Sequence, residues 1–331
     1  MKAVIPVAGV GSKLRPHTHT QPKPLIPVAG KPILGHIIDG LIEADITQIV
    51  FVVGYLKEKI QEYVLGEFED KVECEFVVQT PRKGLAHAIW VAVELFRTEE
   101  EILIVLGDTI FGNDVEDILR IPSSSLGVQE VVDPRTFGVA VVDTHMQVHK
   151  VVEKPQIPTS NLALVGLYKI QEVPLFVQML SEMMEEELPA NHLHSLTDAL
   201  MRMIDRGAYF HAYRVENWYD CGRKQSLLQA NQTLLERIEE FPVYNYDNSV
   251  IIPPVHIAEG CTIKNSIIGP YVAIAEKSTI KNSIVRNSIL GAYSHLESII
   301  LNTSVVGNDA SLKGKSNSVS IGDSTQIDFD E

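Results

Sequence analysis

The amino-acid sequence predicts an α/β domain followed by a short left-handed parallel β-helix. Two observations indicate this fold, and a third indicates the chemistry of the chain. Apolar, strand-like runs alternate with helical patterns up to about residue 240, aliphatic residues then recur every five or six positions, and a glycine-bearing loop with several cations follows the first strand-like run. The first two observations define the fold, and the third indicates the chemistry.

The alternation in the first 240 residues is typical of a mostly parallel sheet with helices on both faces. The strand-like runs are Ala3–Val7, Ile49–Val53, Cys74–Val78 and Ile102–Leu106. The segments with helical spacing between them are Ile33–Ala44, Leu56–Leu65 and Leu85–Phe96. In such a sheet, ligands bind at the carboxyl ends of the strands, so we expect the site there.

The spacing of apolar residues changes after a predicted connector helix, Arg223–Glu240, which ends before Phe241-Pro242. The tetrad Asn-Ser-aliphatic-aliphatic recurs at Asn265–Ile268, Asn282–Val285 and Asn287–Leu290. A near-hexapeptide period is typical of a left-handed parallel β-helix, here of about four coils. We therefore predict a first domain over residues 1–240, a β-helix over 241–321 and an acidic tail over 322–331.

Composition excludes several classes of partner. The 331 residues carry a formal net charge of −15, whereas nucleic acids and anionic membranes require a basic surface. The cysteines Cys74, Cys221 and Cys261 form no C-x-x-C pair, so we expect reduced thiols. No apolar run is long enough for a signal peptide or a membrane span, and we expect a cytoplasmic protein.

The loop after the first strand-like run is suited to binding phosphate. Gly9 and Gly11 allow backbone N–H groups to approach an anion closely, and Lys13, Arg15 and Lys23 can neutralise a polyphosphate from several sides. The spacing differs from both the dinucleotide fingerprint and the P-loop.

This loop resembles the signature of the sugar-phosphate nucleotidylyltransferases, G-x-G-[ST]-R-L-x-P followed by P-K-P-L-x-P-V. Residues 84–88 and the β-helix look most like the long-type glucose-1-phosphate thymidylyltransferases. The resemblance covers nearly the whole chain and implies a Rossmann-like mixed sheet in the nucleotidyltransferase domain. Lys13 stands where the family usually has arginine, so a point charge replaces a planar fork.

Two aspartates are candidate metal ligands. Asp108 follows the strand-like run that ends at Leu106, and Asp220 precedes the connector helix. Each alone reads more readily as a turn or capping residue. Together with a phosphate loop they indicate Mg²⁺, which prefers one or two carboxylates with phosphate oxygens and water.

The resemblance implies roles for further residues. It assigns the nucleotide to Ala8, Gly9, Gly11, Ser12, Gln79 and Gly84, the sugar to Gly138, Glu153 and Gly166, and catalytic cations to Lys13, Arg15, Lys23 and Lys154. Gln79 would hydrogen-bond the base edge, and Lys154 would bind the sugar phosphate. From the residues alone, Glu153-Lys154 would be an ordinary surface ion pair.

The resulting hypothesis is Mg²⁺-dependent transfer of a nucleotidyl group from dTTP to glucose 1-phosphate. One alternative is a uridylyl- or guanylyltransferase acting on another sugar 1-phosphate. A second adds acyltransferase activity in the β-helix, where His256 and His295 lie. A third is a nucleotide-binding regulatory protein with impaired catalysis, for which Lys13 is the main support. Exposed β-helix ends also indicate a homo-oligomer.

Replacing Lys13 by arginine tests whether this position limits turnover. If it does, the planar guanidinium restores a two-point grip on phosphate, and kcat rises about tenfold, or ~1.4 kcal/mol in the barrier. Steady-state pyrophosphate release measures the change. A Lys13→Arg variant no faster than the parent would show that the lysine does not limit the reaction.

Overall fold

The computed structural model describes residues 1–189 and 192–314, which form two compact units. The units divide between Ala230 and Asn231, inside helix α8 (Lys224–Glu236), whereas the sequence places the domain boundary at residue 240. The predicted end of the β-helix at residue 321 and the acidic tail over 322–331 lie outside the described residues.

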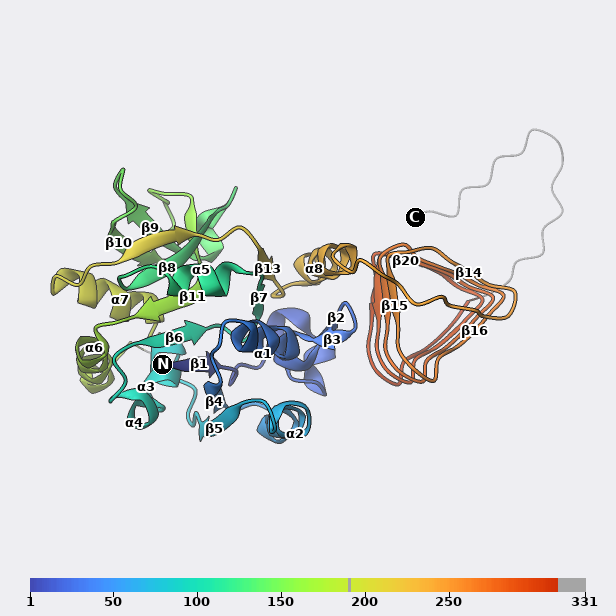
Figure 1. Ribbon diagram of the computed structural model, residues 1–331, viewed down its shortest axis with the longest axis horizontal. Coiled ribbons are helices and arrows are strands. Elements are labelled where there is room, and N and C mark those ends of the chain that lie inside the picture. The colour runs from blue at the N-terminus through green and yellow to red at the C-terminus, as the bar shows by residue number, and fades with distance from the viewer. Residues whose placement is uncertain (190–191, 315–331) are drawn as a thin grey trace. The chain divides into compact units, whose positions relative to one another are not determined.

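A mixed sheet of nine strands forms the centre of the first unit (Figure 1). Its main order is β10-β9-β11-β6-β1-β4-β5, with β8 beside β11 and β12 beside β8. Strands β6, β1, β4 and β5 are parallel, whereas β11 runs antiparallel to β6. The predicted mixed sheet is confirmed. The strands are β1 (Lys2–Pro6), β4 (Gln48–Val53), β5 (Glu73–Val78), β6 (Ile102–Val105), β8 (Ser125–Glu130), β9 (Gly138–Val142), β10 (Val148–Glu153), β11 (Leu162–Ile170) and β12 (His211–Arg214).

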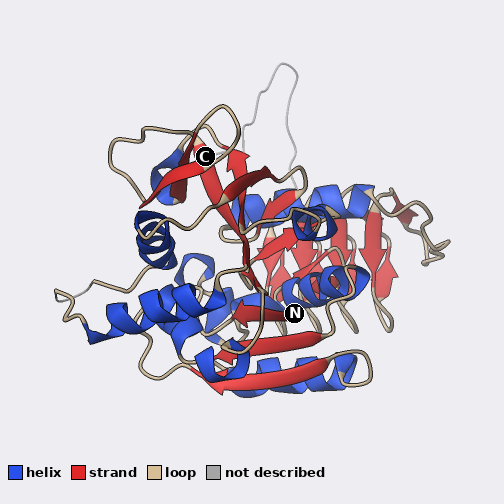
Figure 2. Cartoon of the chain, turned by 60° about the vertical axis from the view of Figure 1, so that its left-hand side comes forward, coloured by secondary structure: helices blue, strands red, loops and turns tan. Residues whose placement is uncertain are grey.

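Helices pack on this sheet around a continuous apolar core (Figure 2). The core joins strand residues such as Val50 and Ile104 to helix residues such as Ile89, Phe176 and Met203. Burial of this surface supplies the main driving force for folding of the unit. The helices are α1 (Ile33–Glu43), α2 (Lys57–Phe68), α3 (Leu85–Trp90), α4 (Val93–Phe96), α5 (Asp114–Leu119), α6 (Val173–Glu185) and α7 (Leu196–Asp205).

Two predicted helices differ from the observed ones. The single helix expected over 85–96 is two short helices, because the N–H of Ala92 donates to the carbonyl of Ile89, three residues back, and breaks the α-helical pattern. The expected connector helix over 223–240 ends at Glu236. Arg237 and Ile238 continue it only with bonds to carbonyls three residues back. Local hydrogen bonding of this kind is not encoded in the apolar spacing.

Two small antiparallel ribbons lie beside the main sheet. Strand β2 (Pro27–Val28) pairs with β3 (Lys31–Pro32), and β7 (Thr109–Phe111) pairs with β13 (Trp218–Asp220). Within the second ribbon, Thr109 lies opposite Asp220. The buried carboxylate of Asp114 supports this pairing, because it accepts the N–H groups of Glu216 at 2.7 Å and Asn217 at 3.0 Å.

The second unit is a left-handed β-helix with three parallel sheets of four strands, as the hexapeptide period predicts (Figure 1). Each coil stacks its inward aliphatic side chains on the next, so that Ile263, Ile280 and Leu296 lie in register and are buried. The strands are β14 (Val250–Ile251), β17 (Ile267–Ile268), β20 (Ile284–Arg286) and β23 (Ile300–Asn302); β15 (Val255–Ile257), β18 (Val272–Ile274), β21 (Ser288–Leu290) and β24 (Val305–Val306); and β16 (Thr262–Lys264), β19 (Thr279–Lys281), β22 (His295–Glu297) and β25 (Ser311–Lys313).

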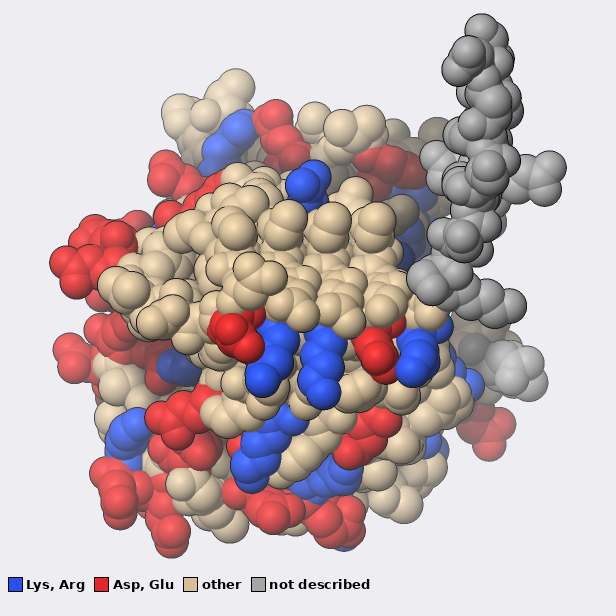
Figure 3. Space-filling model, turned by 90° about the vertical axis from the view of Figure 1, so that its right-hand side faces the viewer, with Lys and Arg blue, Asp and Glu red and all other residues tan. Residues whose placement is uncertain are grey.

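The outer surface of the molecule seen in Figure 3 shows a broad uncharged patch above a row of charged side chains. In the sheet β14-β17-β20-β23, the outward residues Val250 and Ile300 are 55% and 74% exposed. In the sheet β16-β19-β22-β25, by contrast, the last residue of each strand is charged. Lys264 lies beside Lys281, and Glu297 lies beside Lys313. In the described part of the chain, no helix is both long and apolar enough to span a bilayer.

The stacking of the β-helix can be tested at Ile280, which is fully buried. Ile280→Ala removes a side chain from the centre of the stack and leaves a cavity, so the free energy of unfolding falls by about 2–5 kcal/mol. Urea denaturation followed by circular dichroism measures the loss. The control Val243→Ala removes aliphatic atoms from a position of the same unit that is 98% exposed, and it changes stability by less than about 0.5 kcal/mol. Equal losses in the two variants would contradict the inward stacking.

Candidate active site

A cavity of about 1140 Å³ opens in the first unit, with residues from the ends of β1, β6 and β10 in its wall. Ligand cavities commonly measure about 300–1,000 Å³, so this one has room for more than one small molecule. It brings together residues from widely separated parts of the chain. The predicted site residues that line it are Ala8, Gly9, Gly11, Ser12, Lys13, Lys23, Gln79, Gly84, Asp108, Gly138, Glu153, Lys154 and Asp220.

Two predicted site residues do not line this cavity. Arg15 follows the short 3-10 helix over Ser12–Leu14 in extended conformation and is exposed outside the cavity wall. Gly166 lies within β11, and its carbonyl accepts the N–H of Leu106 at 2.9 Å. The structure therefore places Gly166 in the sheet, where it supports the strand that leads to Asp108.

The glycine loop and Lys23 form one packed unit. Gly11 has a φ of 62°, and its carbonyl accepts the hydroxyl of Thr18 at 2.9 Å. A Cβ on Gly11 would lie 2.9 Å from the Cβ of Lys23, too close for an ordinary contact. Glycine is required here both for the left-handed backbone and for the approach of Lys23.

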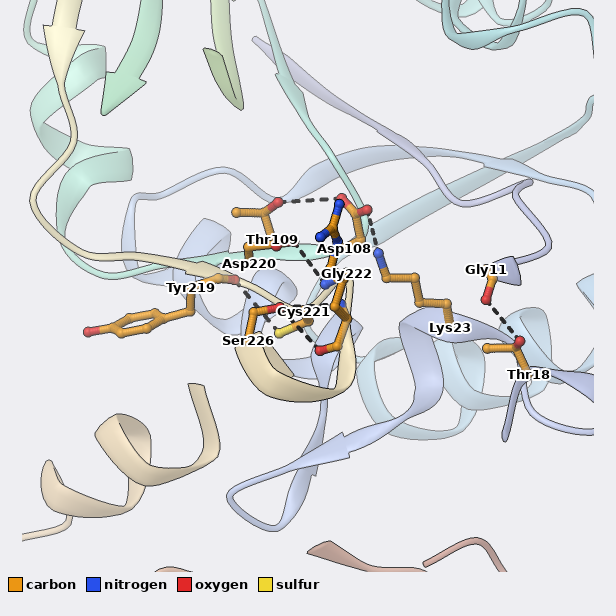
Figure 4. A network of polar contacts seen from close by, with 11 residues as sticks. Gly11, Thr18, Lys23, Asp108, Thr109, Tyr219, Asp220, Cys221, Gly222 and Ser226 are labelled. Atoms are coloured by element: carbon orange, nitrogen blue, oxygen red, sulfur yellow. Dashed lines mark hydrogen bonds and ion pairs between the residues drawn. The ribbon is translucent and has the colours of Figure 1, made fainter. Parts of the chain in front are cut away.

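Lys23 makes an ion pair with Asp108 at the centre of the cavity (Figure 4). The ammonium Nζ lies 2.5 Å from Oδ2 of Asp108, and Thr109 donates to Oδ1 at 3.4 Å. Burial alone raises the pKa of Asp108, but the charge of Lys23 and these hydrogen bonds outweigh it, so the pKa lies below its usual value. Asp108 is therefore ionised at neutral pH, and 43% of its side chain remains exposed to a ligand.

Backbone pairing holds Asp220 beside Asp108. The β7–β13 ribbon places Asp220 opposite Thr109, and the N–H of Cys221 donates to the carbonyl of Asp108 at 3.1 Å. One carboxylate oxygen of Asp220 accepts the N–H of Gly222 at 2.8 Å. Among the described residues, no group of three or more histidines, cysteines or acidic residues could hold a metal. Two carboxylates with open coordination fit Mg²⁺, which takes its other ligands from phosphate and water.

Gln79 and Gly84 lie together in another part of the cavity wall. The amide Nε2 of Gln79 donates to the carbonyl of Gly84 at 2.9 Å. Gly84 has a φ of 112°, and a Cβ there would lie 2.3 Å from the carbonyl oxygen of His194. Only glycine fits this position, which ties the segment before α3 to the segment before α7.

Glu153 and Lys154 lie in a third part of the wall, at the end of β10. Glu153 accepts the hydroxyl of Thr197 at 2.7 Å on one carboxylate oxygen and the ammonium of Lys154 at 2.5 Å on the other. Gly138 lies opposite Glu153 in the β9–β10 pairing. A side chain at Gly138 would crowd Thr197 and Glu153, so the glycine keeps this carboxylate accessible.

The sequence interpretation assigned no role to several side chains that the fold brings into the cavity. Thr197 comes from α7, Trp218 from β13, and Phe137 packs edge-on against Trp218 with ring centroids 5.5 Å apart. Arg82 and Arg223 add cations to the wall. Because Arg223 directly follows the Asp220–Gly222 turn in the sequence, its position could have identified it as a candidate site residue.

Comparison with known proteins agrees with this geometry. The profile of the nucleotidyl transferase family matches residues 2–237. The chain belongs to this family. The family membership confirms the recognition made from the loop over residues 9–28, and the cavity described above lies within the matched region.

Several curated proteins are similar over most of the chain. A low-salt glycan biosynthesis nucleotidyltransferase, Agl11, from Haloferax volcanii is 37% identical over 71% of this chain and 66% of its own length. The bifunctional protein GlmU from Methanocaldococcus jannaschii is 35% identical over 78% of this chain and 61% of its own length. A glucose-1-phosphate thymidylyltransferase from Streptomyces antibioticus is 30% identical over 80% and 74%. The chain thus spans less than two thirds of the first two relatives.

Solved structures share the fold. The crystal structure of a protein named putative glucose-1-phosphate thymidylyltransferase, from Bacillus anthracis, has a TM-score of 0.62 and 28% identity, and the match covers 73% of this chain and 98% of that one. A UDP-glucose pyrophosphorylase structure has a TM-score of 0.60 at 24% identity, which supports the fold alone.

Lys23 can be tested against a matched lysine outside the cavity. Lys23→Met removes the cation beside Asp108 and lowers kcat by about 10²–10³-fold, the usual cost of losing one charged group that stabilises a transition state. Lys31 pairs with Asp39 at an exposed position, so Lys31→Met changes kcat by less than about twofold. Pyrophosphate release measures both. Equal effects in the two variants would contradict a role for Lys23 in the reaction.

Proposed function

We propose that this protein transfers a nucleotidyl group from a nucleoside triphosphate to a sugar 1-phosphate, with dTTP and glucose 1-phosphate as the preferred pair. The observation that carries the proposal is the arrangement of a single cavity. Gln79 and Gly84 supply a surface for a base, Lys23 and the two aspartates supply a centre for phosphates, and Glu153 with Lys154 supplies a polar surface for a sugar phosphate.

The reaction needs no covalent intermediate and no general base. A phosphate oxygen of the sugar 1-phosphate attacks the α-phosphorus of the nucleotide, so a new oxygen–phosphorus bond forms as the bond to the β-phosphate oxygen breaks. Pyrophosphate leaves with the electron pair of that bond. Because the phosphate monoester is already a nucleophile, the chain acts by orienting the two anions and offsetting their charge.

The cations divide this work. In this proposal Lys23, held by the ion pair with Asp108, offsets charge on the reacting phosphates, and Lys13, which lines the cavity, offsets charge on the departing pyrophosphate. Lys154 would bind the sugar phosphate, and Glu153, which pairs with Lys154 and Thr197, would accept hydroxyl groups of the hexose. Arg15 is kept in this proposal as a remote screening charge. In a chain of net charge −15, these cations concentrate positive potential where the substrates bind.

Asp108 and Asp220 would hold Mg²⁺, for which the ionised carboxylate of Asp108 and the neighbouring, partly exposed carboxylate of Asp220 are suited. When bound there, Mg²⁺ supplies positive charge that stabilises phosphate oxygens. The low pKa of Asp108 keeps the carboxylate ready for this role as the pH falls towards the usual titration range of aspartate.

The preference for thymine or uracil over cytosine comes from Gln79. Its Nε2 is already engaged by the carbonyl of Gly84, which leaves the amide oxygen as the group that can meet a base. Thymine and uracil carry an N–H donor at N3 that fits an acceptor. We choose thymine and glucose because a 30% identical relative is named glucose-1-phosphate thymidylyltransferase, and a uridylyltransferase is the second candidate.

The β-helix serves assembly in this proposal. Val250 and Ile300 on its sheet β14-β17-β20-β23 expose aliphatic surface, which supports a homo-oligomer built through these coils. We place the protein in the cytoplasm, where nucleoside triphosphates are made.

Pyrophosphate release with Mg²⁺ tests the function. The grid pairs dTTP, UTP, GTP, CTP and ATP with glucose, mannose, galactose and N-acetylglucosamine 1-phosphates. We expect release at least about tenfold faster with dTTP and glucose 1-phosphate than with any other pair, since one well-placed polar contact commonly discriminates by that much or more. Another active pair would keep the reaction and change the substrates. Nucleotide binding without release across the grid would favour the regulatory alternative.

A further inference from the structure

His87 contacts Gln79 from behind the cavity wall, does not itself line the cavity and has no part in the reaction proposed above. It belongs to α3 and is 6% exposed, and its ring centroid lies 5.9 Å from that of Trp90. Its Nδ1 lies 3.1 Å from Nε2 of Gln79. The side chain of Gln79 is itself buried, so the atoms around the amide decide which way it faces.

The orientation of the Gln79 amide follows from its two neighbours. The backbone carbonyl of Gly84 can only accept a hydrogen bond, so the atom 2.9 Å from it must be the amide nitrogen. That nitrogen has a second hydrogen, which points to Nδ1 of His87. His87 must therefore accept at Nδ1 and carry its own proton on Nε2.

The carbonyl of Gly84 excludes the opposite orientation by itself, and His87 adds to this exclusion while its Nδ1 is an acceptor. The opposite orientation would bring the oxygen of Gln79 against both the carbonyl of Gly84 and the lone pair of Nδ1, which are two acceptors. Unpaired acceptors at such distances are costly when buried. Both hydrogens of the amide nitrogen are used by the protein, and only the amide oxygen remains for a ligand.

We propose that His87 is a specificity-positioning residue: it accepts the second hydrogen of the Gln79 amide, which the carbonyl of Gly84 already orients, so that the base subsite presents only an acceptor and disfavours the N3 lone pair of cytosine. Uracil and thymine offer an N3–H donor to this oxygen, whereas cytosine offers an acceptor lone pair at N3. The inference rests on the proposed function, because it assumes that the base meets Gln79.

The charges around His87 keep it in the accepting form. Burial lowers its pKa, and the neighbouring Lys83 and His194 lower it further. Lys83 precedes α3, and His194 comes from the segment before α7, so both elements that face the ring carry cationic or ionisable groups. At neutral pH the ring is uncharged, and it becomes a donor at Nδ1 only in acid.

The test compares two substitutions at this position. His87→Phe keeps a ring but has no acceptor, whereas His87→Gln keeps an acceptor through its amide oxygen. His36→Phe serves as the control, since His36 is partly buried, bonds the carbonyl of Val28 at 2.9 Å and does not line the cavity. Two quantities are measured: the ratio of kcat/KM for UTP to that for CTP, and the ratio of their dissociation constants by displacement of a fluorescent nucleotide.

We expect the parent to prefer uracil by about 10²-fold or more, and His87→Phe to lose at least about tenfold of this preference. His87→Gln and His36→Phe should keep it. In the parent, both ratios should fall in acid, below the usual titration range of histidine, because the pKa of His87 is lowered, whereas in His87→Phe they should not change with pH, because no proton enters at this position. A purely structural role would lower stability without this change in ratio.

The possible failures are distinguishable. Unchanged uracil preference in folded His87→Phe overturns this inference and leaves the proposed function intact. A parent that fails to distinguish uracil from cytosine, or that binds neither nucleotide, also overturns it. If the parent releases no pyrophosphate but binds UTP more tightly than CTP, and His87→Phe loses that preference, the inference stands and the proposed reaction fails.

Discussion

The pairing of β7 with β13 is the constraint on which the site depends. It joins two segments that are distant in the chain, and it places Asp220 opposite Thr109 and the N–H of Cys221 on the carbonyl of Asp108. The carboxylate of Asp114, buried and bonded to the N–H groups of Glu216 and Asn217, fixes the entry to β13. The carboxylates of Asp108 and Asp220 repel each other, so they can be held close only by the backbone hydrogen bonds of the ribbon, which do not depend on these charges.

The ion pair of Lys23 with Asp108 offsets the cost of burying this carboxylate. Burial raises the pKa of Asp108, but the charge of the Lys23 ammonium and the hydrogen bonds to the carboxylate outweigh burial and keep Asp108 ionised. Lys23 reaches that position because Gly11 has no side chain to block its stem. Through Lys23, the glycine loop thus influences the charge of the aspartate site as well as any bound phosphate. The loop and the aspartates therefore form a single electrostatic unit.

More of the fold than of the site could be predicted from the sequence, and the reason is physical. Burial of aliphatic residues at a fixed period produces both the strands around Ile49–Val53 and the coils stacked on Ile280, and that period is visible in the sequence. The break at Ala92 arises from one local hydrogen bond, which leaves no such period. Thr197 and Trp218 reach the cavity through tertiary packing, so their neighbours Glu153 and Phe137 are adjacent only in the folded chain.

The base subsite shows what residue identity alone cannot specify. A glutamine can donate or accept, and in an unstructured segment Gln79 would be indifferent to the bases that pyrimidine nucleotides carry. The carbonyl of Gly84 uses one amide hydrogen and Nδ1 of His87 uses the other, so the folded chain reduces this residue to a single acceptor. In the proposed base subsite, selectivity would come from the carbonyl of Gly84 and from Nδ1 of His87, which act on the amide of Gln79. Gly84 is in turn placed by His194, whose N–H bonds the carbonyl of Lys83 at 2.9 Å. A change in any of these supporting groups would alter base preference without altering the residues that contact phosphate.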